Sequence, residues 1–339
     1  MKPNIFDLAT KELSQDAFLT WLLSYADPAN AAYDSKLNQC AQQLVNELIS
    51  THVNNFDGII TTVRAGRQWN NVDVWVEVNN TYFIIIEDKT TTGQHSNQLT
   101  RYKEIATDWC LQNNYTSPVC VYIKTGNESL HSLRHVKEAG FSIYNRKHLV
   151  KLLNSHPEIT NDIFTDFKQR LLRLEAENNQ FLTKVLGDWG GVDWQGFFQY
   201  IEREMSIVAW NYVNNPAGGF WCAVLNWDYW NDLYPVYVQL EEGKLCFKIS
   251  TDPEEPVEMP PNVSRGQIRN ELHAMLMQKA KDNDVKNIRK PDRFGSGNYM
   301  TVAIVDKHNW LGSKDSIINP AEVINTLTLY RSFLKKAIQ

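Results

Sequence analysis

The sequence predicts an α/β (α+β) fold, with a mixed central sheet flanked by helices and a second α+β domain that is rich in tryptophan. Two features of the first half support this. Helical and strand-like segments alternate there, and three successive strands precede the first helical crossover. This order favours a mixed sheet covered by helices. From about Gly187 the composition changes, so we expect domains at residues 1–185 and 186–339.

The elements of the first domain follow from the spacing of apolar residues. Val72 to Val78 alternates apolar and polar residues like a half-buried strand, and Tyr82 to Ile86 resembles a buried strand. Asn79-Asn80 favours a hairpin turn between them, because asparagine tolerates left-handed backbone geometry. The same reasoning predicts helices at 13–25, 36–53, 128–139 and across most of 146–182, a helix from about Ser96 to Gln112, strands at 58–66, 119–123 and 141–144, and a loop at 67–71.

The second domain is distinguished by its tryptophans, since seven of the eleven in the chain follow Gly187. Their density indicates core packing, which is commoner for tryptophan than stacking on unpaired bases. No catalytic motif is evident in this half. The pattern predicts two or three strands within 218–250, an acidic proline-rich loop at 253–261, helices at 267–281 and 320–337, and a strand within 297–305.

Composition restricts the class of protein. Apolar residues make up 43% of the chain and charged residues 22%, as in a folded globular protein. No apolar stretch is long enough to span a membrane, and no secretory signal is evident. Five scattered cysteines indicate reduced core thiols in a cytoplasmic protein. The net charge of −5 argues against an extended basic surface for nucleic acid and leaves room for a local basic groove.

A cluster of charges is expected where the predicted hairpin 72–89 begins and ends. Glu87 and Lys89 lie two apart in a strand and so point the same way, whereas Asp88 points the opposite way. Closing the hairpin brings Asp73 near Glu87. Two carboxylates at the end of an apolar sheet need compensation, which a divalent cation such as Mg²⁺ supplies. Lys89 is suited to activating water and stabilising phosphorane charge.

The arrangement Asp73…Glu87-x-Lys89 resembles the motif of the PD-(D/E)xK nuclease superfamily, with Asn71-Val72-Asp73 in place of the Pro-Asp dipeptide. The segment Gln98-Leu-Thr-Arg-Tyr102 resembles the Q-x-x-x-Y element of RecB-like members. Glu12, at the start of a predicted helix, resembles the first-helix glutamate that completes the metal site in many such nucleases.

The resemblance implies a restriction-endonuclease-like fold and hydrolysis of nucleic-acid phosphodiester bonds, with DNA favoured over RNA as substrate and Mg²⁺ or Mn²⁺ as cofactor. By this resemblance Asp73, Glu87 and Glu12 hold the metal ion, and Lys89 helps to activate the attacking water. Gln98 and Tyr102 orient the lysine, the water or the scissile phosphate. It also suggests a role in bacterial genome defence or repair, with endonuclease and exonuclease action both open. The second domain would then select a target, a protein partner or a second copy of the chain.

Two other functions remain open. The chain is a binding sensor for DNA or protein if the nuclease fold is kept without activity, which the acidic net charge favours slightly. It is an interaction protein if the tryptophan-rich half carries the function, in which case the hairpin binds no metal.

Among single residues, Asp16 competes with Glu12 as a metal ligand because it lies one helical turn further on.

Several other patterns are better explained without a site. His131 and His135 lie four apart, as in a zinc helix, but no third ligand is evident, so surface histidines are expected. The glycine-rich segment 294–298 lacks the Lys-Ser/Thr of a P-loop and precedes a strand, so a turn is expected. Four basic residues near the predicted site could contact phosphates, although solvated charges are the commoner explanation: Arg64, Arg67, Arg101 and Lys103.

Overall fold

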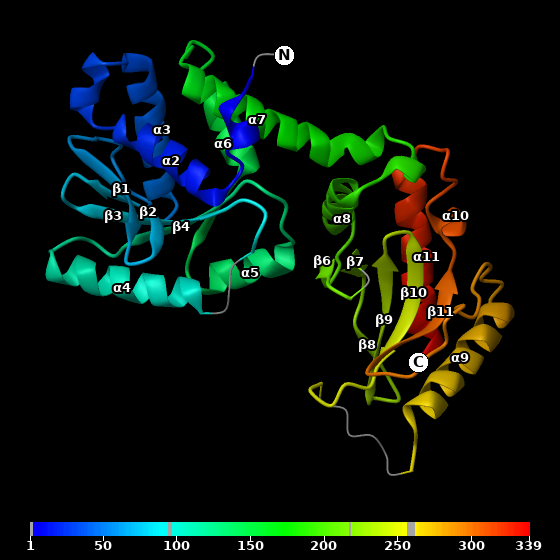
Figure 1. Ribbon diagram of the computed structural model, residues 1–339. Helices are drawn as coiled ribbons and strands as arrows, with labels where there is room; N and C mark the ends of the chain where they lie inside the picture. Colours follow the sequence, from blue (N-terminus) through cyan, green and yellow to red (C-terminus); the bar gives the residue numbers. More distant parts are fainter. Residues whose placement is uncertain (1–2, 94–96, 217, 256–261) are drawn as a thin grey trace. The chain divides into compact units, whose positions relative to one another are not determined.

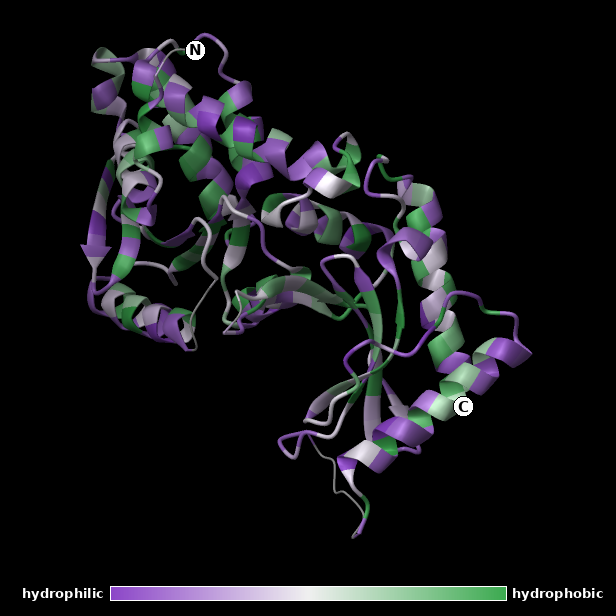
Figure 2. Cartoon of the chain, turned by 45° about the vertical axis from the view of Figure 1, so that its right-hand side comes forward, coloured by the Kyte–Doolittle hydropathy of each residue, from purple (hydrophilic) through white to green (hydrophobic). Residues whose placement is uncertain are grey.

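The computed structural model describes residues 3–93, 97–216, 218–255 and 262–339 (Figure 1). The chain divides into two compact units, Met1–Glu177 and Asn178–Gln339. None of the helices in these described ranges combines the length and the apolar character needed to span a membrane. The helices of both units carry hydrophilic and hydrophobic residues together, as expected of elements that bury one side (Figure 2).

The first unit is built on a mixed sheet of five strands in the order β1-β2-β3-β4-β5. The first three strands pair antiparallel, and β3, β4 and β5 pair parallel. The predicted mixed sheet is therefore confirmed. The strands are β1 (Val63–Trp69), β2 (Val72–Val78), β3 (Tyr82–Lys89), β4 (Val119–Lys124) and β5 (Ser142–Asn145).

Helices cover both faces of this sheet (Figure 1). The crossover helices α4 (Gln98–Gln112) and α5 (Leu130–Glu138) cover one face, where Phe83 and Ile85 are buried. The opposite face buries Ile84 and Ile86 against helices from both ends of the unit. Burial on both faces explains why β3 reads as a continuous apolar run. The remaining helices of the first unit are α1 (Ile5–Leu8), α2 (Glu12–Ser24), η1 (Pro28–Ala32), α3 (Ser35–Ser50), α6 (Arg146–Asn154) and α7 (Asp162–Asn179).

The β2–β3 hairpin forms as predicted, with Asn79 and Asn80 at positive φ. The prediction for β1 was wrong in its bounds. The strand runs over 63–69 rather than 58–66, so most of the expected loop at 67–71 is strand, and only Asn70 and Asn71 turn the chain. The cause is the position of β1 at the sheet edge, where only its first residue is buried, so the strand carries no regular apolar pattern. The predicted start of α4 at Ser96 lies outside the described residues.

The second unit is an antiparallel sheet in the order β11-β10-β9-β7-β6, with β8 paired to β9. Residues 218–250 hold four strands instead of the predicted two or three, because the short β8 also pairs. Neither β6 nor α8 was predicted from the sequence. The elements are η2 (Gln180–Leu182), η3 (Leu186–Asp188), α8 (Gly191–Glu204), β6 (Ala209–Val213), β7 (Phe220–Val224), β8 (Asp228–Trp230), β9 (Tyr234–Glu241), β10 (Lys244–Ser250), α9 (Arg265–Asp282), β11 (Tyr299–Val305), α10 (Lys307–Trp310) and α11 (Pro320–Ala337).

Most tryptophans of the second unit pack into its core, as the sequence predicts. Trp227 is the most exposed of them, at 37%, and it stacks on Tyr237. Phe181 and Leu186 also belong to this core. The second core therefore starts before the expected boundary at residue 186, in agreement with the division between Glu177 and Asn178. The recognition role of residues 186–339 stays a prediction.

Candidate active site

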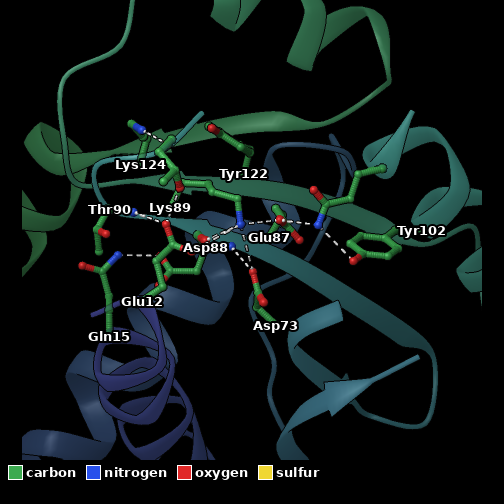
Figure 3. Close-up of polar contacts among 12 residues, drawn as sticks. Glu12, Gln15, Asp73, Glu87, Asp88, Lys89, Thr90, Tyr102, Tyr122 and Lys124 are labelled. Atoms are coloured by element: carbon green, nitrogen blue, oxygen red, sulfur yellow. Dashed lines mark hydrogen bonds and ion pairs between the residues drawn. The ribbon is translucent and has the colours of Figure 1, made fainter. Parts of the chain in front are cut away.

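The predicted catalytic residues come together at one end of the first sheet (Figure 3). Asp73 is the second residue of β2, and Glu87 and Lys89 lie at the end of β3. Because these strands pair antiparallel, the hairpin brings the three side chains to the same end of the sheet. Glu12 begins α2 and Gln98 begins α4, so both helices start beside this cluster.

The ammonium group of Lys89 lies among three carboxylates. Its Nζ is 2.5 Å from Glu87 Oε1, 3.6 Å from Asp73 Oδ2 and 3.7 Å from Glu12 Oε2. It also donates to the backbone carbonyl of Asp88 at 3.0 Å. The side chain is only 7% exposed. Burial alone lowers the pKa of Lys89, but the nearby carboxylates outweigh it and the pKa lies above its ordinary value.

Glu87 is held from the α4 side. The side-chain amide of Gln98 donates to Glu87 Oε1 and to the hydroxyl oxygen of Tyr102, both at 2.9 Å. The spacing of four residues places Gln98 and Tyr102 on one helix face, as predicted. Burial, and then the charge of Asp73, raises the pKa of Glu87 to about 8, while Lys89 opposes the rise. A bound cation would favour the charged form of this carboxyl group.

Glu12 is held by the segment that follows β3. Its Oε1 accepts hydrogen bonds from the Thr92 hydroxyl at 2.6 Å and from the backbone N–H of Thr90 at 3.3 Å. Burial raises the pKa of Glu12, but the hydrogen bond from Thr92 and the charge of Lys89 lower it more, and the net shift is downward. Its carboxylate is therefore ionised at neutral pH and directed toward Lys89.

Asp88 points away from Lys89, as the strand alternation predicts, and packs against α2. Its Oδ1 accepts from the Gln15 side chain at 2.5 Å, and the Thr125 hydroxyl donates to Gln15 Oε1 at 2.8 Å. The backbone N–H of Asp88 donates to Asp73 Oδ2 at 2.9 Å, which fixes that carboxylate. Asp16, the competing candidate ligand, is buried near Asp88. Burial, and then the charge of Asp73, raises its pKa to about 6.

The comparison with known families agrees with this geometry. The model of the PD-(D/E)XK nuclease superfamily matches residues 3–202, a range that includes every residue of the candidate site named in this subsection. The chain belongs to the PD-(D/E)XK nuclease superfamily. No curated protein and no solved structure matches it. Membership implies a nuclease, an enzyme that hydrolyses phosphodiester bonds, and a nucleic acid as its substrate; divalent metal ions are typical cofactors of the superfamily.

The donor set suits such a metal ion. Mg²⁺ and Mn²⁺ prefer hard oxygen ligands, and the carboxylates of Asp73, Glu87 and Glu12 supply them. Glu87 Oε2 is buried without a hydrogen-bond partner among the described residues, so it has a free coordination site. In those residues no three acidic, histidine or cysteine side chains are already grouped tightly enough to hold an ion. The three carboxylates are instead grouped around Lys89.

Sequence reasoning missed the residues that support the cluster. Lys124 is paired in register with Lys89 on the neighbouring strand, is buried, and donates to the backbone carbonyl of Thr92. It also forms an ion pair with Glu128 at 3.4 Å. Thr92 in turn holds Glu12. The only available sequence signal was the position of Lys124 at the end of a predicted buried strand, where a lysine is unusual.

The other basic residues near the motif have protein partners. Arg64 lies 3.7 Å from Glu77, Arg67 donates to the carbonyl of Leu13 at 3.4 Å, and Arg101 lies over the ring of Tyr102. Their contact with phosphates, and that of Lys103, stays a prediction.

His131 and His135 contact each other on α5, and the His135 side chain is 51% exposed. The glycine-rich segment 294–298 leads into β11 as predicted.

Proposed function

We propose that this protein is a metal-dependent deoxyribonuclease whose Mg²⁺ or Mn²⁺ is held by Asp73 and Glu87, with Glu12 as a further ligand. The observation that supports the proposal most strongly is the grouping of these carboxylates around Lys89 at the end of the β2–β3 hairpin. The order of these residues along the chain resembles that of the superfamily motif.

The residues of the chain have distinct roles in the proposed reaction. When bound, the metal ion supplies Lewis-acid stabilisation of the phosphoryl oxygens and the leaving group. Lys89 donates a hydrogen bond that positions the attacking water, and its charge opposes the negative charge that develops on the phosphorane. Gln98 keeps the Glu87 carboxylate in one orientation, and Tyr102 keeps Gln98 in place.

The wider setting of the enzyme is proposed from the same family resemblance. We infer a role in bacterial genome defence or repair, with the second unit selecting the target or a protein partner. The described part of the chain holds one such cluster, so cutting both strands of a duplex requires a homodimer or two successive visits. The five cysteines are free and buried, which supports a reducing compartment such as the cytoplasm.

The test is cleavage of plasmid and single-stranded DNA in Mg²⁺ and in Mn²⁺. We expect wild-type activity in both, and its loss in Lys89→Ala and in Glu87→Ala. Lys137→Ala and Glu138→Ala remove the same residue types from the exposed surface of α5 and should keep full activity. Activity that survives both site substitutions would refute the proposal. If no variant cleaves DNA while Mn²⁺ still binds at Asp73, the binding-sensor alternative gains support.

A further inference from the structure

A cavity of about 680 Å³ lies in the first unit beside the Glu12 side of the proposed active site. Glu12, Thr90 and Thr92 line this cavity and also belong to the hydrogen-bond network of the site. The rest of its wall comes from α1, α2 and the segment between them, from the segment after β4, and from α7. A group bound in the cavity would therefore touch the residues that position one of the three carboxylates.

Most of the exposed area of the cavity lining is apolar. Phe6, Phe167 and Leu171 form a buried apolar wall, and Leu13 lines the cavity while its own side chain is 60% exposed. Such a wall suits the flat face of an aromatic ring and offers nothing to a phosphate. An exposed leucine is unremarkable alone, but here it adjoins both the cavity and Glu12.

Polar side chains also line the cavity, and besides the buried Gln15 and Thr125 several of them are exposed or half-buried. Thr10 and Thr91 are exposed and carry hydroxyl groups, and Lys11 and Arg170 carry positive charges. The hydroxyl groups can pair with the polar edge of a base, and the cations can bind the phosphates on either side of it. An apolar wall with this polar rim matches the chemistry of one nucleotide.

We propose that this cavity binds an unpaired nucleobase next to the scissile phosphate, so that the enzyme prefers single-stranded DNA to duplex DNA. The inference rests on the proposed function, because the scissile phosphate is placed by the carboxylate cluster. A base in a duplex is stacked and paired, and must be turned out of the helix before it can enter a pocket. A base in a single strand is already unpaired and needs no such rotation out of a duplex.

The test fills the cavity from its rim. Thr10→Trp adds an indole at an exposed position, whereas Thr160→Trp adds the same group to an exposed threonine that lines a different cavity, of about 360 Å³. Binding of a fluorescein-labelled single-stranded oligodeoxynucleotide and of the matching duplex is measured by anisotropy, with Ca²⁺ in place of Mg²⁺ to slow cleavage. Circular dichroism reports whether each variant is folded.

We expect wild type and Thr160→Trp to bind the single strand more tightly than the duplex, and Thr10→Trp to lose about tenfold in affinity for the single strand. Leu13→Ser should also weaken single-strand binding several-fold, with Leu130→Ser, at a 56% exposed leucine of α5, as its control. Equal single-strand affinity of wild type, Thr10→Trp and Leu13→Ser would overturn the inference, as would a wild-type preference for duplex. Binding requires no cleavage, so an inactive enzyme would count against the proposed function alone.

Discussion

Lys89 places a buried positive charge where the proposed metal ion would also be attracted. Its ammonium group is within 4 Å of the carboxylates of Glu87, Asp73 and Glu12. These interactions partly offset the repulsion among the carboxylates in the metal-free protein. A divalent cation among the same oxygens would be repelled by the lysine, so the two cations compete electrostatically for one set of ligands.

This competition predicts the metal affinities of the variants. Lys89→Ala should bind Mn²⁺ at least as tightly as wild type, because a like charge is removed from the site. Asp73→Ala and Glu87→Ala should each bind Mn²⁺ at least about tenfold more weakly, because each removes an anionic ligand. Isothermal titration calorimetry measures all four proteins. Loss of binding in Lys89→Ala would show that the lysine is needed to form the ligand set.

Gln98 and Tyr102 should contribute unequally to the rate of DNA cleavage, although a hydrogen bond joins their side chains. Gln98 donates directly to the Glu87 carboxylate, and hydrogen bonds to charged groups are worth about 1.5–3 kcal/mol. We expect Gln98→Leu to lower kcat for plasmid nicking about tenfold or more. Tyr102→Phe removes only an acceptor of Gln98 and should cost a few-fold at most. Equal losses in the two variants would mean that Tyr102 acts on the substrate itself.

The cysteines give a prediction at residue scale that is independent of the site. Burial raises the pKa of Cys40 and Cys120 to about 12 and that of Cys110 and Cys222 to about 11, and it also raises that of Cys246. A raised pKa keeps a thiol protonated at pH 8, and the thiolate is the reactive form. The native protein should therefore react slowly with a disulfide reagent at pH 8, and all five thiols should react quickly in guanidinium. Rapid reaction of the native protein would contradict this.

At the scale of elements, the segment after β3 depends on its close approach to the segment after β4. A Cβ added at Gly126 would lie 1.9 Å from the backbone oxygen of Thr90. A backbone atom cannot move aside as a side chain can, so the two segments would separate. The N–H of Thr90 and the hydroxyl of Thr92 hold Glu12, and their displacement would move that carboxylate.

Gly126→Ala should therefore lower DNA cleavage by about tenfold or more and destabilise the first unit by about 1–3 kcal/mol. Gly297→Ala is the matched control, because a Cβ there meets nothing within 4 Å. Cleavage assays and urea unfolding of both variants check the prediction. Full activity in Gly126→Ala would show that Glu12 does not depend on this contact.

The sequence was most informative where a local pattern sets the geometry. Strand alternation and the Asn79-Asn80 turn were sufficient to place Asp73, Glu87 and Lys89 together. Helical spacing was sufficient to pair Gln98 with Tyr102. The roles of Thr92 and Lys124 could not be predicted, because they arise where segments from two different strands meet. The edge strand β1 and the short strand β8 were misjudged because weak or brief apolar patterns carry little signal.

At the scale of the whole molecule, the chain holds separate cores. The first unit buries both faces of a mixed sheet, and the second packs its aromatic residues between an antiparallel sheet and its own helices. The carboxylate cluster and the cavity beside it draw only on residues of the first unit. The catalytic chemistry should therefore depend on the folding of the first unit alone, even though the family match extends to residue 202.

Destabilising the second core tests this independence. Phe247 is fully buried against Tyr330 and Phe333, and Phe247→Ala should cost about 3–5 kcal/mol in the stability of the second unit. In urea we expect an early transition of that unit, with Mn²⁺ binding persisting until a later transition. Phe164→Ala, at a fully buried residue of the first core, should reverse the order and abolish Mn²⁺ binding early. If Mn²⁺ binding disappears with the first transition in both variants, the two cores unfold as one cooperative structure, and the second unit supports catalysis as well as recognition.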